Sequence, residues 1–596
     1  MSMHIDDKIQ LRKRTLNTMQ GLFFLMVTAA VIMVVLSFGL KFSKPVYQLI
    51  REYHLFVLVY SAVWYFVRAM IARSTAGVNK WNLIPAYLLL LTLLLFQLKI
   101  IHIDQGLFHY LHHRYLASIA ILFIFLKEIS LGISRILKLK FEPAILMMAA
   151  FSLIIFAGAA VLMLPRATTI EISFIDAIFT ATSATCITGL TVLDVSQDFT
   201  RLGQTIIILL AQAGALGIMT FATFFAIFLQ TDSNSFQGNM AMKEVLSVDK
   251  LSEIFSTIYK IIFITLLLES VGIINLYFAL QPVVSIPDSD KLFVAIFHGI
   301  SAFCHAGFSN LPNGLMHEGV NESFYFLSVI MVLVYSGSLG FPIVFSYYGL
   351  LKRKLIGRFR QIVFKERYIH PNRVINATTA IVIISTLALL IVGFGLVALI
   401  EWNGLLWDKS QGQKILHSLF SSVTARSSGF NTVDFASYSK PTILIIILLM
   451  WIGAAPVSTG GGIKVTTFSV ALLNLGSLLK GKQKVEFRRR RIGDDTIRKS
   501  YAVIFLSFIF IGVGVVFLCF FQPHLPILHV VFECFSAYTT TGLSLGITPE
   551  LNTSSKVVVC LLMFIGRLGT LSILAAIVRN IETNSYEYPS EEIIIT

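Results

Sequence analysis

Long apolar runs separated by short polar segments occupy almost the whole chain. Four runs come first, at roughly residues 21–41, 54–72, 83–102 and 116–137. Each is long enough to cross a bilayer core of about 30 Å as a helix. From about residue 141 the pattern changes to a repeated unit, in which a long apolar run, a short amphipathic segment, a polar loop and a second long run follow one another. The pattern predicts an all-α polytopic membrane protein.

The repeated unit occurs four times. We place the copies at residues 141–232, 250–350, 373–478 and 498–580, after an N-terminal four-helix extension (1–140) and before a short cytoplasmic tail (581–596). The amphipathic segment of each unit has about 10–12 residues, too few to span a bilayer, and predicts a re-entrant half-helix. Non-helical backbone at membrane depth is tolerated only inside protein or beside water, so the loop that follows should line an aqueous path.

The polar loops share one motif centred on a glycine. Aligned on it, they read SATCITGLT (Ser183–Thr191), SAFCHAGFS (Ser301–Ser309), VTARSSGFN (Val423–Asn431) and SAYTTTGLS (Ser536–Ser544). After each glycine come Leu or Phe and then a small polar residue. Four copies of helix, re-entrant pore loop and helix predict pseudo-repeats arranged around one pore.

Such loops can replace the hydration shell of a cation with backbone carbonyl oxygens. Glycine permits backbone angles that a side chain would block, and the carboxyl ends of the half-helices add partial negative charge. No Asp or Glu occurs in the four residues before any loop glycine. Carbonyl ligands suit a monovalent cation, whereas Mg²⁺ or Ca²⁺ calls for carboxylates. Taken alone, the loops therefore predict a pore for a monovalent cation.

The second long run of each unit contains a further motif, in which a glycine is followed three positions later by a glycine or a proline. The four copies read GALG at 214–217, GSLG at 337–340, GAAP at 453–456 and GRLG at 566–569. Small residues let helices approach closely, so these sites predict tight packing. The third run is interrupted by PVSTGGGIK (Pro456–Lys464), which a continuous helix does not accommodate. The fourth contains Arg567 at mid-span, where a charge is costly and normally faces water or a partner.

Composition and charge support a membrane protein and exclude other classes. Hydrophobic residues make up 56% of the 596 residues, charged residues only 13%, and the net charge is +15. The basic residues cluster in linkers, eight within 352–373 and nine within 480–499. The positive-inside rule places these linkers and both termini in the cytoplasm, with the glycine loops opening outward. This distribution argues against nucleic acid binding. The five cysteines lack the spacing of a disulfide framework or zinc site, and no phosphate-binding or catalytic motif indicates an enzyme.

The four loops, the broken third run with STGGGIK and Arg567 together resemble the Trk/Ktr/HKT superfamily of K⁺ transporters, from about Phe141 to the C-terminus. The third loop, TARSSGFNTVD, and the tail, YEYPSEEIII, are similar to the Ktr type of membrane subunit (TrkH/KtrB-type). In this family loop glycines accompany K⁺ selectivity and a serine at the first accompanies Na⁺ permeation. Because all four positions are glycine, the resemblance implies K⁺ uptake.

The resemblance also assigns site residues, with K⁺ bound mainly by filter carbonyls. The implied filter comprises Ile187, Thr188, Gly189, His305, Ala306, Gly307, Ser427, Ser428, Gly429, Thr540, Thr541 and Gly542. The implied gate comprises Ala455, Pro456, Ser458, Thr459, Gly460, Gly461, Gly462 and Lys464 below the filter, with Arg567 on the ion path to limit leak.

The resemblance further implies a homodimer in the cell membrane, with K⁺ as the transported ion and no organic cofactor in this chain. It implies gating by cytosolic nucleotide-binding regulatory subunits of the TrkA/KtrA type, for which the basic linkers and the tail are the docking surfaces we expect.

Several alternatives stay open at this level. The protein can be a Na⁺- or H⁺-coupled cation symporter, a Na⁺-permeable member of the superfamily, a twelve-helix carrier with alternating access, or a non-transporting scaffold. The role of residues 1–140 is undetermined; a scaffold or dimer-packing element fits better than a voltage sensor, because the fourth run has only Lys127 and Arg135 as bases.

Three side chains allow two interpretations each, and for a fourth, Arg426, one contact is expected. Arg567 is either a leak-limiting charge or a packing cation bonded to helix-end carbonyls. His305 is either a pH switch or a loop residue that does not titrate. Arg426 is expected to bond a nearby acid such as Asp434. Glu533 either faces the pore or packs behind it.

Overall fold

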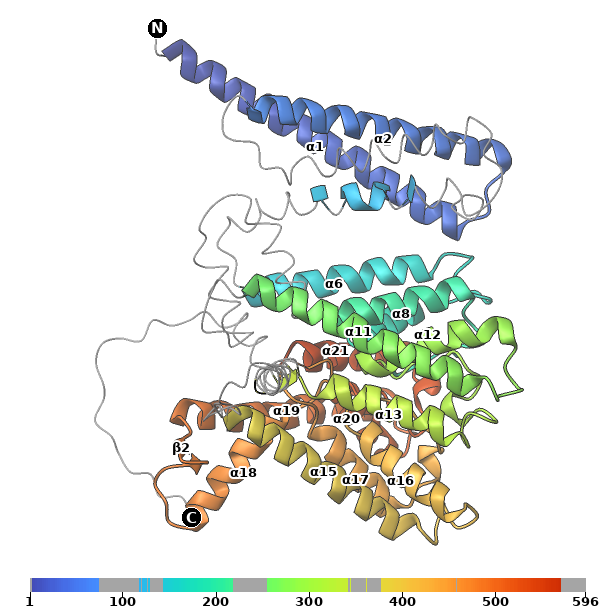
Figure 1. Ribbon diagram of the computed structural model, residues 1–596, viewed down its shortest axis with the longest axis vertical. Coiled ribbons are helices and arrows are strands. Elements are labelled where there is room, and N and C mark those ends of the chain that lie inside the picture. The colour runs from blue at the N-terminus through green and yellow to red at the C-terminus, as the bar shows by residue number, and fades with distance from the viewer. Residues whose placement is uncertain are drawn as a thin grey trace.

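The computed structural model describes residues 3–73, 143–217, 254–340, 377–456 and 458–569, with short pieces within 117–128 and at 343–344 and 361. Helices dominate these ranges (Figure 1). The strands are β1 (Glu486–Phe487) and β2 (Arg490–Arg491), a small antiparallel hairpin that follows the third repeat. The sequence prediction of an all-α membrane fold is confirmed.

Each repeat contains an outer helix, a half-helix and an inner helix. The first has α6 (Pro143–Leu162), α7 (Phe174–Thr185) and α8 (Arg201–Leu216), and the second has α11 (Ile254–Leu280), α12 (Asp288–Cys304) and α13 (Phe324–Ser338). The third has α15 (Ala377–Glu401), α16 (Gln411–Thr424), α17 (Lys440–Trp451) and, after a break, α18 (Val465–Leu479). The fourth has α19 (Asp494–Phe521), α20 (Ile527–Thr539) and α21 (Thr553–Leu568). Short 3₁₀ turns, η5 (Gly314–Met316), η6 (Phe435–Ser437) and η7 (Thr548–Glu550), follow the second, third and fourth glycine loops.

The repeats close into a ring. The inner helix of each packs on the half-helix of the next: α8 on α12, α13 on α16, α17 on α20, and α21 back on α7. Figure 1 shows this closure, with red α21 from the end of the chain lying among the teal and green helices of the first two repeats. The half-helices point into the ring and the outer helices surround it.

Hydrophobicity explains which helices lie outside. Five helices in the described part of the chain are long and apolar enough to cross a membrane: α1 and the outer helices α6, α11, α15 and α19. Large apolar side chains on them remain exposed, such as Leu153 at 69% and Phe520 at 76%. Phe179, Phe297 and Phe532 on the half-helices are fully buried. The outer helices therefore present a lipid-compatible surface while the half-helices form the core.

Local sequence signals set where these helices begin. Ser173 caps α7, Thr200 caps α8 and Asn552 caps α21, each side chain accepting a hydrogen bond from a backbone N–H in the first turn. Ser410 and Gln413 form a reciprocal capping box at the start of α16. A polar cap lets a helix begin without leaving its first N–H groups unsatisfied. Two half-helices (α7 and α16) and two inner helices (α8 and α21) thus begin at defined polar caps.

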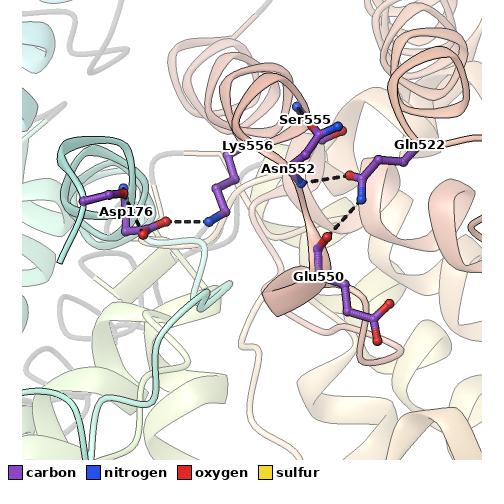
Figure 2. A network of polar contacts seen from close by, with 7 residues as sticks. Asp176, Gln522, Glu550, Asn552, Ser555 and Lys556 are labelled. Atoms are coloured by element: carbon purple, nitrogen blue, oxygen red, sulfur yellow. Dashed lines mark hydrogen bonds and ion pairs between the residues drawn. The ribbon is translucent and has the colours of Figure 1, made fainter. Parts of the chain in front are cut away.

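Two ion pairs fasten neighbouring repeats. Lys556 Nζ at the start of α21 lies 2.6 Å from Asp176 Oδ1 at the start of α7, and Arg201 at the start of α8 pairs with Asp290 in α12 (Figure 2 shows the first). Beside the first pair, Gln522 donates to the Glu550 carbonyl at 2.9 Å and accepts from Asn552 N at 3.1 Å. The two ion pairs join the fourth repeat to the first and the first to the second, whereas the bonds of Gln522 lie within the fourth repeat.

The inner-helix glycines pack as closely as their sequence predicts. A Cβ built at Gly214, Gly337 or Gly566 would overlap the carbonyl oxygen of Thr185, Phe303 or Tyr538, respectively. Each of these carbonyls lies four residues before a loop glycine. Glycine therefore brings three inner helices into backbone contact with the ends of the half-helices. In the third repeat Gly453 contacts Gly461 of the interrupting segment instead.

The N-terminal helices form a hairpin at one end of the molecule (Figure 1). α1 (Met3–Gly39) and α2 (Lys44–Arg73) pack through a cluster that includes Phe23 and Trp64, and the Tyr65 hydroxyl donates to Glu128 at 3.0 Å. Arg166 N donates to the Gly39 carbonyl at 3.1 Å and so joins this hairpin to the first repeat. The predicted third run (83–102), the linker 352–373 and the tail 581–596 lie outside the described residues.

Candidate functional site

All four glycine loops adopt the same unusual backbone. The glycine has positive φ in each, at 90° (Gly189), 68° (Gly307), 79° (Gly429) and 86° (Gly542). The residue two positions earlier is also left-handed although it has a side chain: Ile187 at 57°, His305 at 63°, Ser427 at 71° and Thr540 at 49°. A positive φ is uncommon for residues with a side chain, and glycine adopts it without that steric cost. The four loops therefore share one backbone conformation, with a positive φ at two positions that lie two residues apart.

The glycines form a closed ring of backbone contacts. A Cβ built at Gly189 would lie 2.5 Å from the Ala306 carbonyl oxygen, and one at Gly307 would lie 2.8 Å from the Ser428 oxygen. One at Gly429 would lie 2.6 Å from the Thr541 oxygen, and one at Gly542 would overlap the Thr188 oxygen. The order runs from the first loop to the fourth and returns to the first. The carbonyl that precedes each glycine thus abuts the glycine of the preceding loop, where no side chain fits.

Hydroxyl groups at the ends of the half-helices hold the loops in this shape. Ser183 Oγ accepts from Gly189 N at 3.0 Å and donates to the Leu190 carbonyl at 2.8 Å. Ser301 donates to the Phe308 carbonyl at 2.8 Å, and Ser536 accepts from Gly542 N at 3.0 Å. In the third loop Thr424 takes this role by donating to the Phe430 carbonyl at 2.6 Å. The serine at the start of three motifs, and Thr424 as the second residue of the third motif, therefore have a structural function.

Within the part of the chain that the structure describes, three buried hydroxyls at the filter have no hydrogen-bond partner. They are Thr188 Oγ1, Ser428 Oγ and Thr540 Oγ1, all in residues with no exposed surface. A buried polar atom without a partner is costly and is normally satisfied by a water or an ion. The filter thus combines ordered carbonyl oxygens with hydroxyls that still have capacity to bind a ligand.

The side chains of His305 and Ser427 join the filter to its surroundings. The ring nitrogens of His305 lie 2.7 Å from the Ser427 carbonyl oxygen and 2.8 Å from that of Val334. Ser427 Oγ donates to the Thr540 carbonyl at 3.1 Å and accepts from Gly461 N at 2.8 Å. The sequence predicted a backbone role for Ser427, and for His305 it left open a pH switch or a loop residue that does not titrate. Their side chains also link loops two, three and four with the segment below.

Arg426 differs from its expected contact. Its guanidinium is buried and donates to the carbonyls of Thr386 at 3.4 Å and Gly453 at 3.3 Å, so the predicted pairing with Asp434 is wrong. Asp434 instead caps η6 by accepting from Ala436 N and the Ser437 hydroxyl. Asp434 lies eight residues further along the chain, where the short turn offers it closer donors.

The third inner helix is broken as predicted, but its break begins earlier. α17 ends at Trp451 and α18 begins at Val465, and the described residues between them (452–456 and 458–464) form a non-helical segment. Gly453 N donates to the Ile463 carbonyl at 2.9 Å, which closes the segment at its base. Thr459 Oγ1 bonds to the carbonyls of Phe303 at 3.1 Å and Gly337 at 3.0 Å. The segment therefore lies directly against the filter loops.

The predicted gate residues from Ala455 to Lys464 lie in this segment, and several of them bond to one another or contact the second repeat. Ser458 Oγ donates to the Ala455 carbonyl at 2.6 Å, and Lys464 Nζ donates to the Gly460 carbonyl at 2.8 Å. The carbonyl of Pro456 lies against Gly340, and Gly462 has a φ of 73°. Glycine is required there because this conformation disfavours a side chain.

Arg567 joins the gate segment to the first repeat. It is 7% exposed and donates to the Thr459 carbonyl at 2.7 Å and to the Gly214 carbonyl at 3.1 Å. Thr459 belongs to the non-helical segment and Gly214 to the last turn of α8. The bond to Gly214 matches the interpretation of a cation bonded to helix-end carbonyls, and the bond to Thr459 connects the arginine to the predicted gate segment.

Two polar residues of the half-helices lie behind filter loops: Glu533, for which the sequence left a pore-facing and a packed position open, and His298, which the sequence did not single out. Glu533 in α20 packs behind the fourth loop and bonds to Ser544 and Thr548, and His298 in α12 packs behind the second loop and bonds to Ser309. The signal that could have indicated them is a titratable residue at the same distance before two of the four loop glycines.

Comparison with known proteins agrees with this architecture. The TrkH family, described as cation transport protein, matches residues 135–588. A Ktr system potassium uptake protein B of Bacillus subtilis is 35% identical over 454 residues, covering 76% of this chain and 97% of that protein. The potassium/sodium uptake protein NtpJ of Enterococcus hirae is 31% identical over 472 residues, covering 76% and 98%.

A solved structure has the same fold. The potassium transporter TrkH from Vibrio parahaemolyticus superposes with a TM-score of 0.58 at 15% identity, over 87% of this chain and 96% of that one. The family match spans most of the chain and includes all four glycine loops. The chain belongs to the TrkH family of cation transport proteins, which are transporters and not enzymes.

Proposed function

We propose that this chain is the ion-translocating membrane subunit of a K⁺ uptake system, with the four glycine loops as its selectivity filter. The observation that carries this proposal is the closed ring, in which each loop glycine abuts the carbonyl oxygen that precedes the next glycine. Such a ring surrounds a dehydrated cation with oxygen atoms. The B. subtilis relative is named a potassium uptake protein, which supports K⁺ as the ion.

The ligand chemistry of the filter favours a monovalent cation. Carbonyl oxygens are joined there by the free hydroxyls of Thr188, Ser428 and Thr540. The carboxylate of Glu533, in α20, is bonded to Ser544 and Thr548 behind the loop. Divalent cations are bound by several carboxylates, so the neutral oxygens of the filter suit K⁺.

The segment 452–464 is the gate in this proposal. It lies against the filter through Thr459 and Gly461, and three consecutive glycines (460–462) let its backbone rearrange. Arg567 holds it by the Thr459 carbonyl. Breaking the bond between Arg567 and the Thr459 carbonyl would release the segment. It would also let the positively charged guanidinium of Arg567 move within the ion path.

Assembly and regulation complete the proposal. We infer that two copies associate in the cell membrane with both termini in the cytoplasm, and that a ring of cytosolic nucleotide-binding subunits controls the gate. Exposed bases of the β1–β2 hairpin, Arg488 to Arg491, support a docking surface on the side where the linkers concentrate positive charge. The family resemblance supports both the dimer and the ring.

The principal alternative to selective passive uptake is a pore that also conducts Na⁺ or that couples K⁺ uptake to Na⁺. The E. hirae relative is named a potassium/sodium uptake protein, which favours testing this alternative. Glycine at all four filter positions favours K⁺ selectivity.

Ion flux into proteoliposomes tests the proposal. The purified full chain should take up Rb⁺ and K⁺ down their gradients, and Na⁺ at a rate lower by about tenfold or more, a difference of about 1.4 kcal/mol in barrier. An imposed Na⁺ gradient should leave K⁺ flux unchanged. Equal Na⁺ and K⁺ flux, or no flux, would contradict K⁺ selectivity; K⁺ accumulation driven by Na⁺ would indicate a symporter.

A further inference from the structure

We propose that Glu533 and His298 are positioning residues that hold the segments directly after the filter glycines of loops four and two, and thereby contribute to discrimination between K⁺ and Na⁺. This inference rests on the proposed function of the ring as a K⁺ filter. It assigns a role to two titratable side chains of the half-helices. Neither side chain is part of the ring of carbonyl oxygens.

In the fourth loop the contacts form a closed set. Glu533 is fully buried in α20, where Oε2 accepts from the Ser544 hydroxyl at 2.8 Å and Oε1 accepts from the Thr548 hydroxyl at 2.5 Å. Ser544 Oγ in turn accepts from Gly546 N at 3.1 Å. The carboxylate therefore holds both the second residue after Gly542 and the start of η7.

The second loop has the same arrangement with a different side chain. His298 lies nine residues before Gly307, as Glu533 does before Gly542, and Ser309 lies two residues after it, as Ser544 does. His298 Nε2 lies 2.8 Å from Ser309 Oγ, which accepts from Leu311 N at 3.1 Å. Nδ1 faces the Val294 carbonyl at 2.9 Å, so we assign the hydrogen to Nδ1 and make Nε2 the acceptor for the serine.

The other two loops lack this contact. Their residues at the equivalent position are Thr180 and Phe420, and Thr191 and Asn431 replace the serine. The third loop is held one turn earlier, where His417 Nδ1 lies 3.0 Å from Thr432 Oγ1. Loops two and four are not adjacent in the ring, so the serine contact is a twofold feature of the fourfold filter.

Position matters here because the filter has little room to adjust. Gly542 lies against the Thr188 carbonyl and Gly307 against the Ser428 carbonyl, so a shift of either glycine also moves an oxygen of a neighbouring loop. Leaving a buried hydrogen-bonding group without its partner costs free energy. Losing the Ser544 bond should therefore loosen the ring enough for the smaller Na⁺ to be bound as well.

The test compares Ser544→Ala, Glu533→Ala and Glu533→Gln in proteoliposomes by the ratio of Rb⁺ to Na⁺ uptake. Ser544→Ala and Glu533→Ala should each lower the ratio by roughly tenfold, the effect expected for losing a buried hydrogen bond. Glu533→Gln should retain most of the ratio because its amide oxygen still accepts from Ser544. The double variant Glu533→Ala/Ser544→Ala should be no worse than Glu533→Ala, since both changes remove one interaction. Ser309→Ala should lower the ratio in the same direction.

A matched control lies away from the filter. Glu401 at the end of α15 is also buried and also accepts from a serine and a threonine, Ser439 at 2.6 Å and Thr442 at 2.5 Å. Glu401→Ala should lower thermal stability without changing the ratio. Where Glu533→Ala does not fold, Ser544→Ala, which removes one hydroxyl, decides the outcome.

Three results would overturn the inference. They are an unchanged ratio in folded Ser544→Ala, an equal loss of ratio in Glu401→Ala, and additive effects in the double variant. A wild-type chain that does not discriminate would overturn the K⁺ filter together with this inference, whereas a discriminating wild type with insensitive variants would overturn the positioning role alone.

Discussion

At the scale of single residues, the filter depends on backbone conformations that most amino acids avoid. Ile187, His305, Ser427 and Thr540 are left-handed although each has a Cβ, at a cost of about 1 kcal/mol each. The half-helices and the hydroxyls at their ends hold these residues in place. The sequence identified the four glycines from their repetition, whereas nothing in the four different residues two positions earlier indicated their conformation.

Replacing Gly189 by Ser should let Na⁺ compete with K⁺. The new Cβ would lie 2.5 Å from the Ala306 carbonyl oxygen at a φ of 90°, so that oxygen or the loop must move. The Rb⁺ to Na⁺ uptake ratio in proteoliposomes should fall by about tenfold, or about 1.4 kcal/mol.

Gly395→Ser in α15 is the matched control, because nothing lies within 4 Å of a Cβ there. It should leave the ratio unchanged. If Gly189→Ser also leaves it unchanged, the first loop does not belong to the filter.

At the scale of elements, the break between α17 and α18 brings a flexible segment under the filter. The segment is fastened to loop two by Thr459, to loop three by Ser427 and Arg426, and to the first and fourth repeats by Arg567. The sequence indicated the break through Pro456 and three glycines. It did not indicate that the helix ends at Trp451, because residues 452–455 are apolar and small and become non-helical only through contacts with distant residues.

Arg567→Ala should raise K⁺ flux, because it removes a positive charge and the bond that holds Thr459. We expect an increase of up to about tenfold, the effect of about 1.4 kcal/mol on a barrier. Initial rates of Rb⁺ uptake by proteoliposomes with equal protein content measure it. Arg567→Lys, which retains the charge, should stay closer to wild type; flux equal to wild type in Arg567→Ala would identify a packing cation.

At the scale of the whole molecule, one chain builds a ring whose first and last repeats must meet. Contacts between α21 and α7 close that ring. The ion pair of Lys556 with Asp176 also closes it and joins two residues that lie 380 positions apart in the sequence. The pair is largely buried, with side-chain exposures of 13% and 16%. It therefore stabilises the closure more than a surface pair would.

Lys556→Ala should lower the free energy of unfolding by about 1–3 kcal/mol, since it leaves the Asp176 carboxylate partly buried without its cation. Thermal unfolding of the detergent-solubilised chain, followed by size-exclusion chromatography, measures the change. Arg491→Ala removes an exposed pair with Asp494, where side-chain exposures are 51% and 63%, and should cost less than about 0.5 kcal/mol. If the two changes lower the free energy of unfolding equally, the Lys556–Asp176 pair contributes no more to stability than an exposed ion pair.

Removing residues 1–134 should leave selective flux in place. The family match begins at residue 135. The B. subtilis and E. hirae relatives align over 97% and 98% of their own length, but these alignments include only 76% of this chain. The described contacts of the hairpin with the first repeat involve Gly39 and Phe38, which bond Arg166 at its edge. Proteoliposome uptake by the shortened chain should show the wild-type Rb⁺ to Na⁺ ratio; a lost ratio would make the N-terminal helices part of the conducting unit.

The sequence by itself determined the membrane class, the four repeats and the filter glycines, because hydrophobic length and repeated motifs are local properties that survive in one dimension. Only the tertiary structure decided which groups meet. Arg426 bonds to Thr386 and Gly453 rather than to Asp434, and Glu533 packs behind the loop on Ser544. These pairings depend on how half-helices and inner helices of different repeats approach one another, which no local pattern records. The physical reason is that a buried polar group bonds to whatever donor or acceptor the packing of distant segments brings within reach.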